Sequence, residues 1–185
     1  MSTAAVKLTY ADLLALPDDR MRHELVDGEH YVTAAPTQRH QEVLGNLFLI
    51  ITPFVRAHRL GKVFVAPLDV LLSDFDVLEP DVLFVGRARL ARLEERFVRG
   101  APDLAVEVLS PSTRGRDLTV KRRVYRQFGV GEYWIVDPAQ ETIEIFRGGG
   151  SWFRAAESLS RAAGPQTFAS PLFPGLVLGL DQIFE

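Results

Sequence analysis

The chain of 185 residues contains no cysteine, and this absence excludes both disulfide bonds and metal sites built on thiolate sulfur. A bound metal ion would have to use oxygen or histidine ligands, which favours Mg²⁺ or Mn²⁺ over structural zinc. Long hydrophobic runs are also missing, because no stretch approaches about 18 uninterrupted apolar residues, and the N-terminus carries no secretory signal pattern. We therefore expect a cytoplasmic protein with no membrane partner.

The sequence also lacks an excess of positive charge. Its formal net charge is −3 and its pI is about 5.8, which argues against a protein that coats nucleic acid through bulk charge. A local basic groove remains compatible with these values. The chain has no evident internal repeat, domain linker, helix-turn-helix or zinc finger, and 47% of its residues are hydrophobic. We therefore expect one domain over residues 1–185.

Lysine is scarce, since only Lys7, Lys62 and Lys121 stand among 21 basic residues, and the third has an unusual place. Winding residues 117–128 at about 100° per residue puts Lys121 near the middle of an apolar stripe. The stripe consists of Leu118, Val120, Val124, Tyr125 and Phe128. A buried ammonium is costly without an anion, so Lys121 either extends past its neighbours to solvent or meets an acidic group inside the protein.

The pattern of the other segments predicts a mixed α/β (α+β) protein. Asp27-Gly28 between two short alternating runs predicts an N-terminal β-hairpin, and Thr9 with Asp12 predicts a capping box that opens a short helix. Helical spacing predicts a long helix over 37–60, and the arginine-rich segment 87–99 is expected to be a helix or an exposed connection. The expected strands are 63–72, 77–85, 104–109, 132–137 and 142–146.

Two acidic residues stand where buried strands do not ordinarily accept them. Asp81 begins an apolar strand directly after Pro80, and Glu107 interrupts the apolar run 104–109. A buried carboxylate without a partner costs several kcal/mol, and a divalent metal ion is one partner that would offset this cost. Mg²⁺ is commonly held by one or two carboxylates and several waters. Asp81 and Glu107 as metal ligands, with Lys121 beside them, would suffice for phosphodiester hydrolysis.

Two stretches, 79–85 and 102–138, resemble the Uma-type family of putative restriction endonucleases, a branch of the PD-(D/E)XK nuclease superfamily. The most specific motifs are EVLSPST and GVGEYWIVDP, and the likeness extends to 22–29, 36–40 and 174–180. It implies a restriction-endonuclease-like core, with a central mixed β-sheet flanked by helices and the catalytic acids on neighbouring strands. It also implies that Asp81 and Glu107 bind metal and that Lys121 is the catalytic lysine.

The chain departs from the superfamily pattern at one position. Leu109 stands two residues after Glu107, where the lysine of the motif would be expected. In this family the lysine is expected on the following helix, which agrees with the inward position of Lys121 on the helical wheel. The likeness also makes Glu24, in the hairpin, a candidate further catalytic acid. The alternative for Glu24 is a strand residue paired with a nearby arginine.

Several neighbouring residues are candidates for substrate binding. His40, at the start of the long helix, is a candidate contact to substrate or metal, although a histidine near a helix N-terminus is more often structural or solvated. Hydroxyl and guanidinium groups in the loop before the Lys121 helix could hold a phosphate, although such residues are often simply solvated. They are Ser110, Thr113, Arg114 and Arg116. Asp117 is expected to cap that helix.

These observations predict a Mg²⁺-dependent DNA endonuclease, with Mn²⁺ as a possible substitute ion. A homodimer is expected by analogy, because cutting both strands of a duplex requires two sites. One alternative is a catalytically silent nuclease fold that binds DNA or a protein. Another is a metal-dependent hydrolase of a smaller phosphate ester, which would not need the clustered arginines. The sequence does not predict a recognised DNA sequence.

Overall fold

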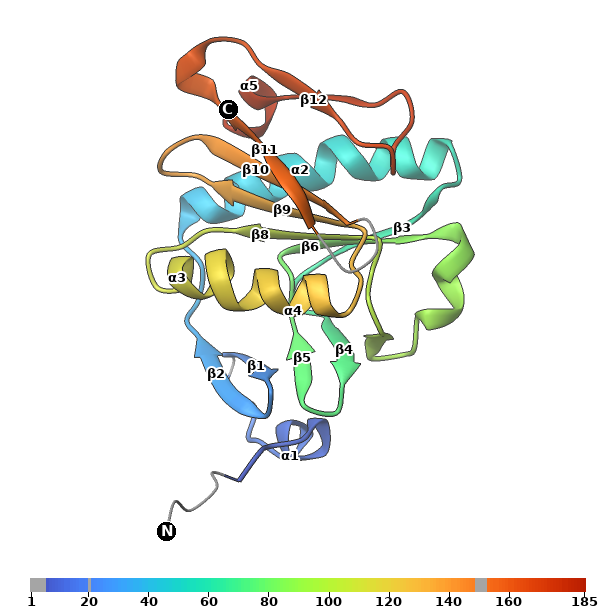
Figure 1. Ribbon diagram of the computed structural model, residues 1–185, viewed down its shortest axis with the longest axis vertical. Coiled ribbons are helices and arrows are strands. Elements are labelled where there is room, and N and C mark those ends of the chain that lie inside the picture. The colour runs from blue at the N-terminus through green and yellow to red at the C-terminus, as the bar shows by residue number, and fades with distance from the viewer. Residues whose placement is uncertain (1–5, 20, 149–152) are drawn as a thin grey trace.

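The centre of the computed structural model, which describes residues 6–19, 21–148 and 153–185, is a six-stranded mixed sheet (Figure 1). Only β8 and β9 run parallel, and every other neighbouring pair is antiparallel. In spatial order the strands are β11 (Phe153–Ser160), β10 (Thr142–Gly148), β9 (Glu132–Asp137), β8 (Leu104–Val108), β6 (Val82–Gly86) and β3 (Gly61–Val65). The predicted central mixed sheet is confirmed.

Helices cover both faces of this sheet. The long helix α2 (Gln38–Ala57) lies behind it in Figure 1, and a second helical segment lies in front. That segment runs without interruption through α3 (Arg114–Arg116), the π-helical turn η2 (Asp117–Lys121) and α4 (Arg122–Gln127). Successive side chains of β8 point to opposite faces of the sheet. Val106 packs in the hydrophobic core between the sheet and α2 (the α2 core), and Ala105 packs in the core between the sheet and α4 (the α4 core). Glu107 must then point toward the α4 side.

A smaller five-stranded sheet carries the N-terminal hairpin. The hairpin pairs β1 (Arg22–Val26) with β2 (Glu29–Thr33) through Asp27 and Gly28, whose φ values of 50° and 75° suit a tight two-residue turn. The other strands are β5 (Asp76–Leu78), β4 (Asp69–Ser73) and β7 (Phe97–Arg99). The short helix α1 (Tyr10–Leu14) begins with the predicted capping box of Thr9 and Asp12. Both N-terminal predictions are confirmed.

Two of the predicted strands were wrong in one respect, because each is divided between the two sheets. Residues 63–72 form the end of β3 and most of β4, and residues 77–85 form β5 and most of β6. Pro67 and Pro80 lie at the breaks. Proline has no backbone N–H for a strand ladder, so the chain leaves one sheet there and joins the other. The second break places Asp81 at the junction of the two sheets.

The remaining segments complete the layers. The predicted helix 37–60 is confirmed as α2, although it ends at Ala57 and Gly61 already belongs to β3. The arginine-rich segment forms a 3₁₀ helix, η1 (Arg87–Arg92), followed by β7. The C-terminal part contains η3 (Arg161–Ala163), β12 (Thr167–Ala169), β13 (Val177–Gly179) and α5 (Leu180–Ile183). Phe168, Leu178 and Ile183 from this part pack into the α2 core.

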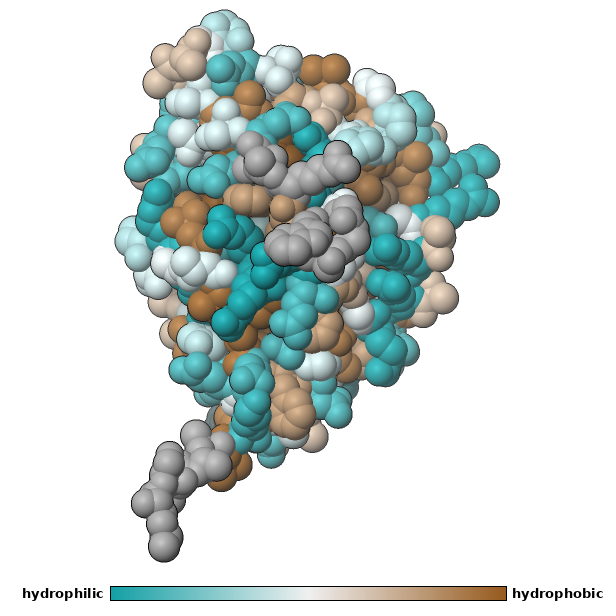
Figure 2. All heavy atoms as spheres, viewed as in Figure 1, coloured by the Kyte–Doolittle hydropathy of each residue, from teal (hydrophilic) through white to brown (hydrophobic). Residues whose placement is uncertain are grey.

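The surface is mixed in character. On the face shown in Figure 2, hydrophobic side chains occur in small groups among hydrophilic ones. The cores beneath are extensive, with Trp134, Tyr125 and Tyr133 among the largest fully buried side chains. None of the helices in the described part of the chain is long and apolar enough to cross a membrane.

Candidate active site

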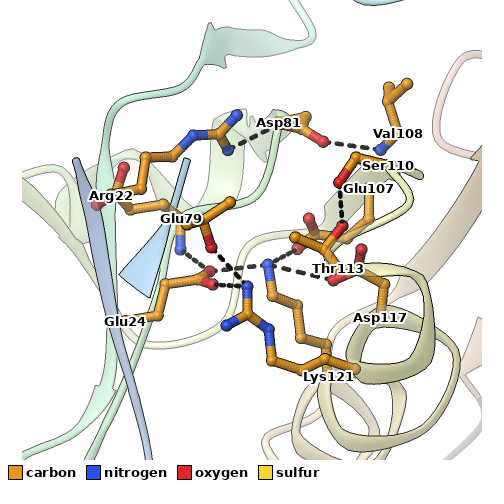
Figure 3. Close-up of polar contacts among 12 residues, drawn as sticks. Arg22, Glu24, Glu79, Asp81, Glu107, Val108, Ser110, Thr113, Asp117 and Lys121 are labelled. Carbon is orange, nitrogen blue, oxygen red and sulfur yellow. Dashed lines mark hydrogen bonds and ion pairs between the residues drawn. The ribbon is translucent and has the colours of Figure 1, made fainter. Parts of the chain in front are cut away.

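Two carboxylates face each other across neighbouring strands at the junction of the sheets. Asp81 directly precedes β6 and Glu107 lies near the end of β8. The antiparallel register pairs Val82 with Val106, so the next residues outward, Asp81 and Glu107, lie opposite one another (Figure 3). Each is only 2% exposed. The sequence therefore folds to bring two buried acids together where Pro80 ends one strand and allows the next to begin.

Lys121 lies between acidic groups and not in solvent. Its Nζ atom is 2.8 Å from Oε1 of Glu24 and 3.0 Å from Oε1 of Glu107, and its side chain is 3% exposed. Oδ1 of Asp117 lies 3.6 Å away from the same Nζ. The inward position predicted by the helical wheel is confirmed, and extension to solvent is wrong. Three carboxylates raise the pKa of Lys121 well above its ordinary value against the opposing effect of burial, so the amine stays charged.

The prediction that Asp117 caps the Lys121 helix is wrong. The helix begins at Arg114, so Asp117 lies inside it and does not cap it. Its side chain is buried and shares a helix face with Lys121, four residues on. This i, i+4 spacing was a signal in the sequence that Asp117 belongs to the site. The π-helical turn spans both residues, and such turns frequently occur at functional sites.

Glu24 pairs with an arginine, which is one of the two alternatives that the sequence left open, and it also contacts Lys121. One oxygen, Oε1, accepts from Lys121 and, at 2.9 Å, from the backbone N–H of Glu79. The other oxygen lies 3.0 Å from Nη2 of Arg116. Glu24 thus pairs with an arginine, as a strand residue would, and also holds the candidate catalytic lysine. Three donors fix its carboxylate in place.

Asp81 is held by a separate set of donors. Nη1 of Arg22 lies 2.8 Å from Oδ1, while Oδ2 accepts from the backbone N–H of Val108 at 2.8 Å and lies 3.2 Å from Nε2 of His40. The hydrogen bond to His40 and the charge of Arg22 lower the pKa of Asp81 despite burial, which acts in the opposite direction and is the largest single effect. Sequence reasoning missed Arg22, although its i, i+2 spacing from Glu24 puts both on one face of β1.

A cavity of about 160 Å³ opens beside these groups. Ser110, Thr113 and Arg116 line it together with His40 and the acids. The two hydroxyl oxygens of Ser110 and Thr113 lie 3.0 Å apart. Arg116 also donates to Oγ1 of Thr33 at 2.7 Å. The structure thus gathers these predicted substrate-binding residues at one opening.

Arg114 lies apart from the other candidates. It is not among the residues that line the cavity, and its guanidinium pairs with Asp137 at the end of β9. The two arginines were predicted in a loop, but both belong to α3, and they point to different partners. Arg116 lies in the cavity wall, and Arg114 ties the start of the helix to the central sheet.

The site carries more negative than positive charge. Five buried carboxylates belong to Glu24, Glu79, Asp81, Glu107 and Asp117, and the cations facing them are Arg22, Arg116 and Lys121. With all five acids ionised and His40 neutral, two negative charges remain unbalanced. Burial and neighbouring carboxylates raise the pKa of Glu79 to about 7, and burial raises the pKa of Glu107 well above its ordinary value although Lys121 opposes it.

This charge excess fits a divalent cation. Asp81 and Glu107 supply the carboxylate oxygens that Mg²⁺ prefers, and Oδ1 of Asp117 is buried nearby with no hydrogen-bond partner among the described residues. Within those residues no three or more acidic or histidine side chains are grouped as a complete metal site. A Mg²⁺-type site does not require such a group, because two carboxylates plus water and substrate oxygens fill its coordination shell.

Tyr125 supports Glu107 from the other side and was predicted only as part of the apolar stripe. Its phenol donates to Oε1 of Glu107 at 2.8 Å, the oxygen that also accepts from Lys121. We expect Tyr125→Phe to lower the free energy of unfolding by about 1–3 kcal/mol, because it removes a buried hydrogen bond to an acidic group. Urea denaturation measures this loss.

The matched control is Tyr31→Phe. The phenol of Tyr31 donates to Glu29 at 2.8 Å on the surface, so its loss should cost less than about 0.5 kcal/mol. Equal effects of the two variants would contradict the role given to the Tyr125 hydroxyl.

Comparison with known proteins agrees with the fold described above. The crystal structure of a putative nuclease belonging to DUF820 from Anabaena variabilis ATCC 29413 matches with a TM-score of 0.79. The two chains are 20% identical, and the match covers 96% of this chain and 97% of the other. At this identity the likeness shows a shared fold. No curated protein matches the chain.

The family comparison extends over almost the whole sequence. The Uma2 family model, described as "Putative restriction endonuclease", matches residues 10–181. This span contains both opposed carboxylates, the buried lysine and every residue that lines the cavity beside them. The chain therefore belongs to the Uma2 family of putative restriction endonucleases.

Proposed function

We propose that this protein is a divalent-metal-dependent DNA endonuclease that hydrolyses phosphodiester bonds. One observation carries the proposal: Asp81 and Glu107 face each other on adjacent strands, and Lys121 is buried against Glu107 beside an open cavity. Two acids and an amine suffice for phosphodiester hydrolysis when a metal ion assists. Family membership supports a nuclease, and the site geometry supports the choice of residues.

Asp81 and Glu107 would hold the ion, either Mg²⁺ or Mn²⁺. When bound, such an ion polarises the scissile phosphate and lowers the pKa of the attacking water. Arg22 donates to Oδ1 of Asp81 and would help to orient that carboxylate. His40 and the Val108 N–H hold the other oxygen and keep the carboxylate oriented.

Lys121 would stabilise the negative charge that develops on the phosphoryl oxygens. An ammonium that is already buried and oriented needs no reorganisation during the reaction, which makes its charge more effective than in water. Glu24 positions this amine from the opposite side to Glu107 and also positions Arg116. Glu24, predicted as a further catalytic acid beside Asp81 and Glu107, is therefore proposed as a positioning residue.

Substrate phosphates would bind where the cavity opens. Arg116 and the hydroxyls of Ser110 and Thr113 line this opening and offer donors to phosphate oxygens. Arg114 lies outside the cavity, so it would reach a neighbouring phosphate only by leaving Asp137. A homodimer would supply the second site needed to cut the other strand of a duplex.

Supercoiled plasmid tests the proposal directly. We expect purified protein to nick the plasmid with Mg²⁺ or Mn²⁺ and to lose this activity in EDTA, because the ion would polarise the phosphate and lower the pKa of the attacking water. A small diester, bis(p-nitrophenyl) phosphate, serves as the comparison substrate. Cleavage of the small diester without DNA cleavage would favour a hydrolase of smaller phosphate esters.

The binding alternative has its own outcome in the same experiment. If folded protein retards plasmid or single-stranded DNA in a gel but cleaves neither with any divalent ion, the nuclease proposal is wrong and a catalytically silent DNA-binding module replaces it. Linear plasmid appearing before full nicking, with a dimeric mass by light scattering, is the result expected for two cooperating sites. A monomeric mass with nicking alone would contradict the homodimer.

A further inference from the structure

A second hollow lies at the other end of the central sheet from the acidic site. It is bounded by the C-terminal part of α2, the start of β3 and the start of η1, which meet at the right of Figure 1. Its volume is about 600 Å³, within the range of sites that bind small organic molecules. The five residues of β6 lie between Asp81 and Arg87, which are six residue steps apart, a distance of about 20 Å in an extended strand. The hollow is therefore separate from the catalytic cavity.

Four cations surround this hollow, and no acidic residue lines it. They are Arg56, Arg59, Lys62 and Arg87. All four are exposed, and within the described residues none makes an ion pair or a side-chain hydrogen bond. Other arginines of the chain are mostly paired, as Arg116 is with Glu24 and Arg161 with Asp181. Four unpaired cations around one opening repel one another, and an anionic ligand would relieve this repulsion.

The wall of the hollow is apolar. Val55, Val63, Phe64 and Leu90 line it between the cations. A flat patch of arginines on a solvated helix face has no such wall, so the arrangement differs from an ordinary charged surface. Apolar walls accept a planar or apolar group, which a simple inorganic anion does not possess. The lining thus favours a ligand with both an anionic and an apolar part.

Thr52 adds one polar group to the wall. It is 8% exposed, and its hydroxyl oxygen has no hydrogen-bond partner among the described residues. A buried hydroxyl without a partner costs free energy, so native proteins usually satisfy such a group with protein, water or ligand. Its position in this wall makes a ligand that carries a hydrogen-bonding edge a fitting partner.

We propose that this hollow, the basic pocket, binds a nucleoside phosphate. The phosphates would meet Arg56, Arg59, Lys62 and Arg87, and the base would lie against the apolar wall with a polar edge near Thr52. The ligand is either a free nucleotide or the terminal nucleotide of a nucleic-acid strand, because both present the same chemistry. The inference is independent of the reaction at the acidic site.

Isothermal titration of the full chain in EDTA tests the basic pocket without involving a metal at Asp81 and Glu107. The probes are ATP, adenosine, inorganic triphosphate and a 5′-phosphorylated tetradeoxyadenylate. We expect ATP or the tetranucleotide to bind at least about tenfold more tightly than adenosine and inorganic triphosphate, because only the first two occupy both the cations and the wall. Tighter binding of ATP would indicate a free nucleotide as the ligand, and tighter binding of the tetranucleotide would indicate the terminal nucleotide of a strand.

Charge reversal locates the binding. The double variant Arg59→Glu, Lys62→Glu should weaken the binding of the tighter probe at least about tenfold. The matched control, Arg123→Glu with Arg126→Glu, changes the charge equally on the exposed face of α4 and should leave affinity nearly unchanged. The proposal would be overturned if neither nucleotide probe binds, if the tighter nucleotide probe binds no better than inorganic triphosphate, or if both double variants lose affinity equally. None of these outcomes affects the plasmid experiment.

Discussion

Lys121→Ala is expected to lower the free energy of unfolding by about 3–5 kcal/mol, because it removes one cation that three buried carboxylates share. Its Nζ atom lies 2.8 Å from Glu24 and 3.0 Å from Glu107, with Asp117 at 3.6 Å. Without the amine, these acids must either stay charged in a dry environment or take up protons. Urea denaturation at neutral pH without metal measures the loss. Nicking activity should fall with it.

Two further variants separate the buried ion pairs from a general effect of losing a lysine. Lys7→Ala breaks an ion pair with Asp27 in which the two side chains are 53% and 74% exposed, and should cost no more than about 1 kcal/mol. Lys121→Met with Glu107→Gln removes both charges of one pair while keeping side-chain volume, and should recover part of the stability lost in Lys121→Met. Equal costs for Lys7→Ala and Lys121→Ala, or strictly additive effects in the double variant, would refute this account.

The buried lysine could be predicted because helical periodicity is a local property. The apolar stripe around Lys121 repeats at the spacing of an α-helix, and a charged residue at its centre needs an internal partner whatever the rest of the fold is. The hairpin and the capping box are likewise set by four or five consecutive residues. For these elements the sequence pattern and the structure agree.

The division of the chain between two sheets could not be predicted from the same kind of pattern. Residues 77–85 read as one apolar strand, but β5 and β6 belong to different sheets. An apolar residue in either sheet looks the same in sequence, and only tertiary packing decides which sheet it joins. Pro80 was the available signal, since proline interrupts a strand ladder.

The full set of hydrogen-bond donors around the acids could also not be predicted from the sequence. Arg22 is far from Asp81 along the chain, and the phenol of Tyr125 reaches Glu107 from a residue that reads as core. The first contact depends on how the sheet of the N-terminal hairpin docks against the central sheet, and the second on how α4 packs on the central sheet. No local pattern specifies either arrangement. Asp117 differs from Arg22 and Tyr125, because its i, i+4 spacing from Lys121 is visible in the sequence. That spacing indicates a shared helix face, whereas the prediction assigned Asp117 to the helix cap.

The distribution of charge in the site leads to the second large effect. The acids outnumber the facing cations by two when all are ionised, and keeping all five charged without a metal ion is unfavourable, as the raised pKa values of Glu79 and Glu107 indicate. Function and stability should then respond in opposite directions when one acid is neutralised. Proteins commonly retain such unfavourable charge at functional sites because the bound ligand or ion requires it.

Glu107→Gln is therefore expected to reduce plasmid nicking by about 10²- to 10³-fold or more while leaving metal-free stability unchanged or higher by about 1 kcal/mol. The amide cannot serve as a charged metal ligand, but its oxygen can still accept hydrogen bonds from Tyr125 and Lys121. Lys121 also retains Glu24 and Asp117 as ionic partners. Mg²⁺ should stabilise the wild type by about 2.7 kcal/mol at a hundred times its dissociation constant, and Glu107→Gln should abolish this gain.

Asp81→Asn and Asp74→Asn complete the comparison in the same thermal and denaturant measurements. Asp81→Asn should also lose nicking and metal stabilisation, but it leaves Arg22 without its carboxylate, so a modest loss of metal-free stability is expected as well. Asp74 is exposed, and its replacement should alter neither property. Retained Mg²⁺ stabilisation in Glu107→Gln would mean that the ion binds elsewhere. A large loss of metal-free stability in that variant would show that Glu107 stabilises the fold and does not serve to bind the ion. The reason is that neutralising a carboxylate whose role is the ion pair with Lys121 lowers the free energy of unfolding directly.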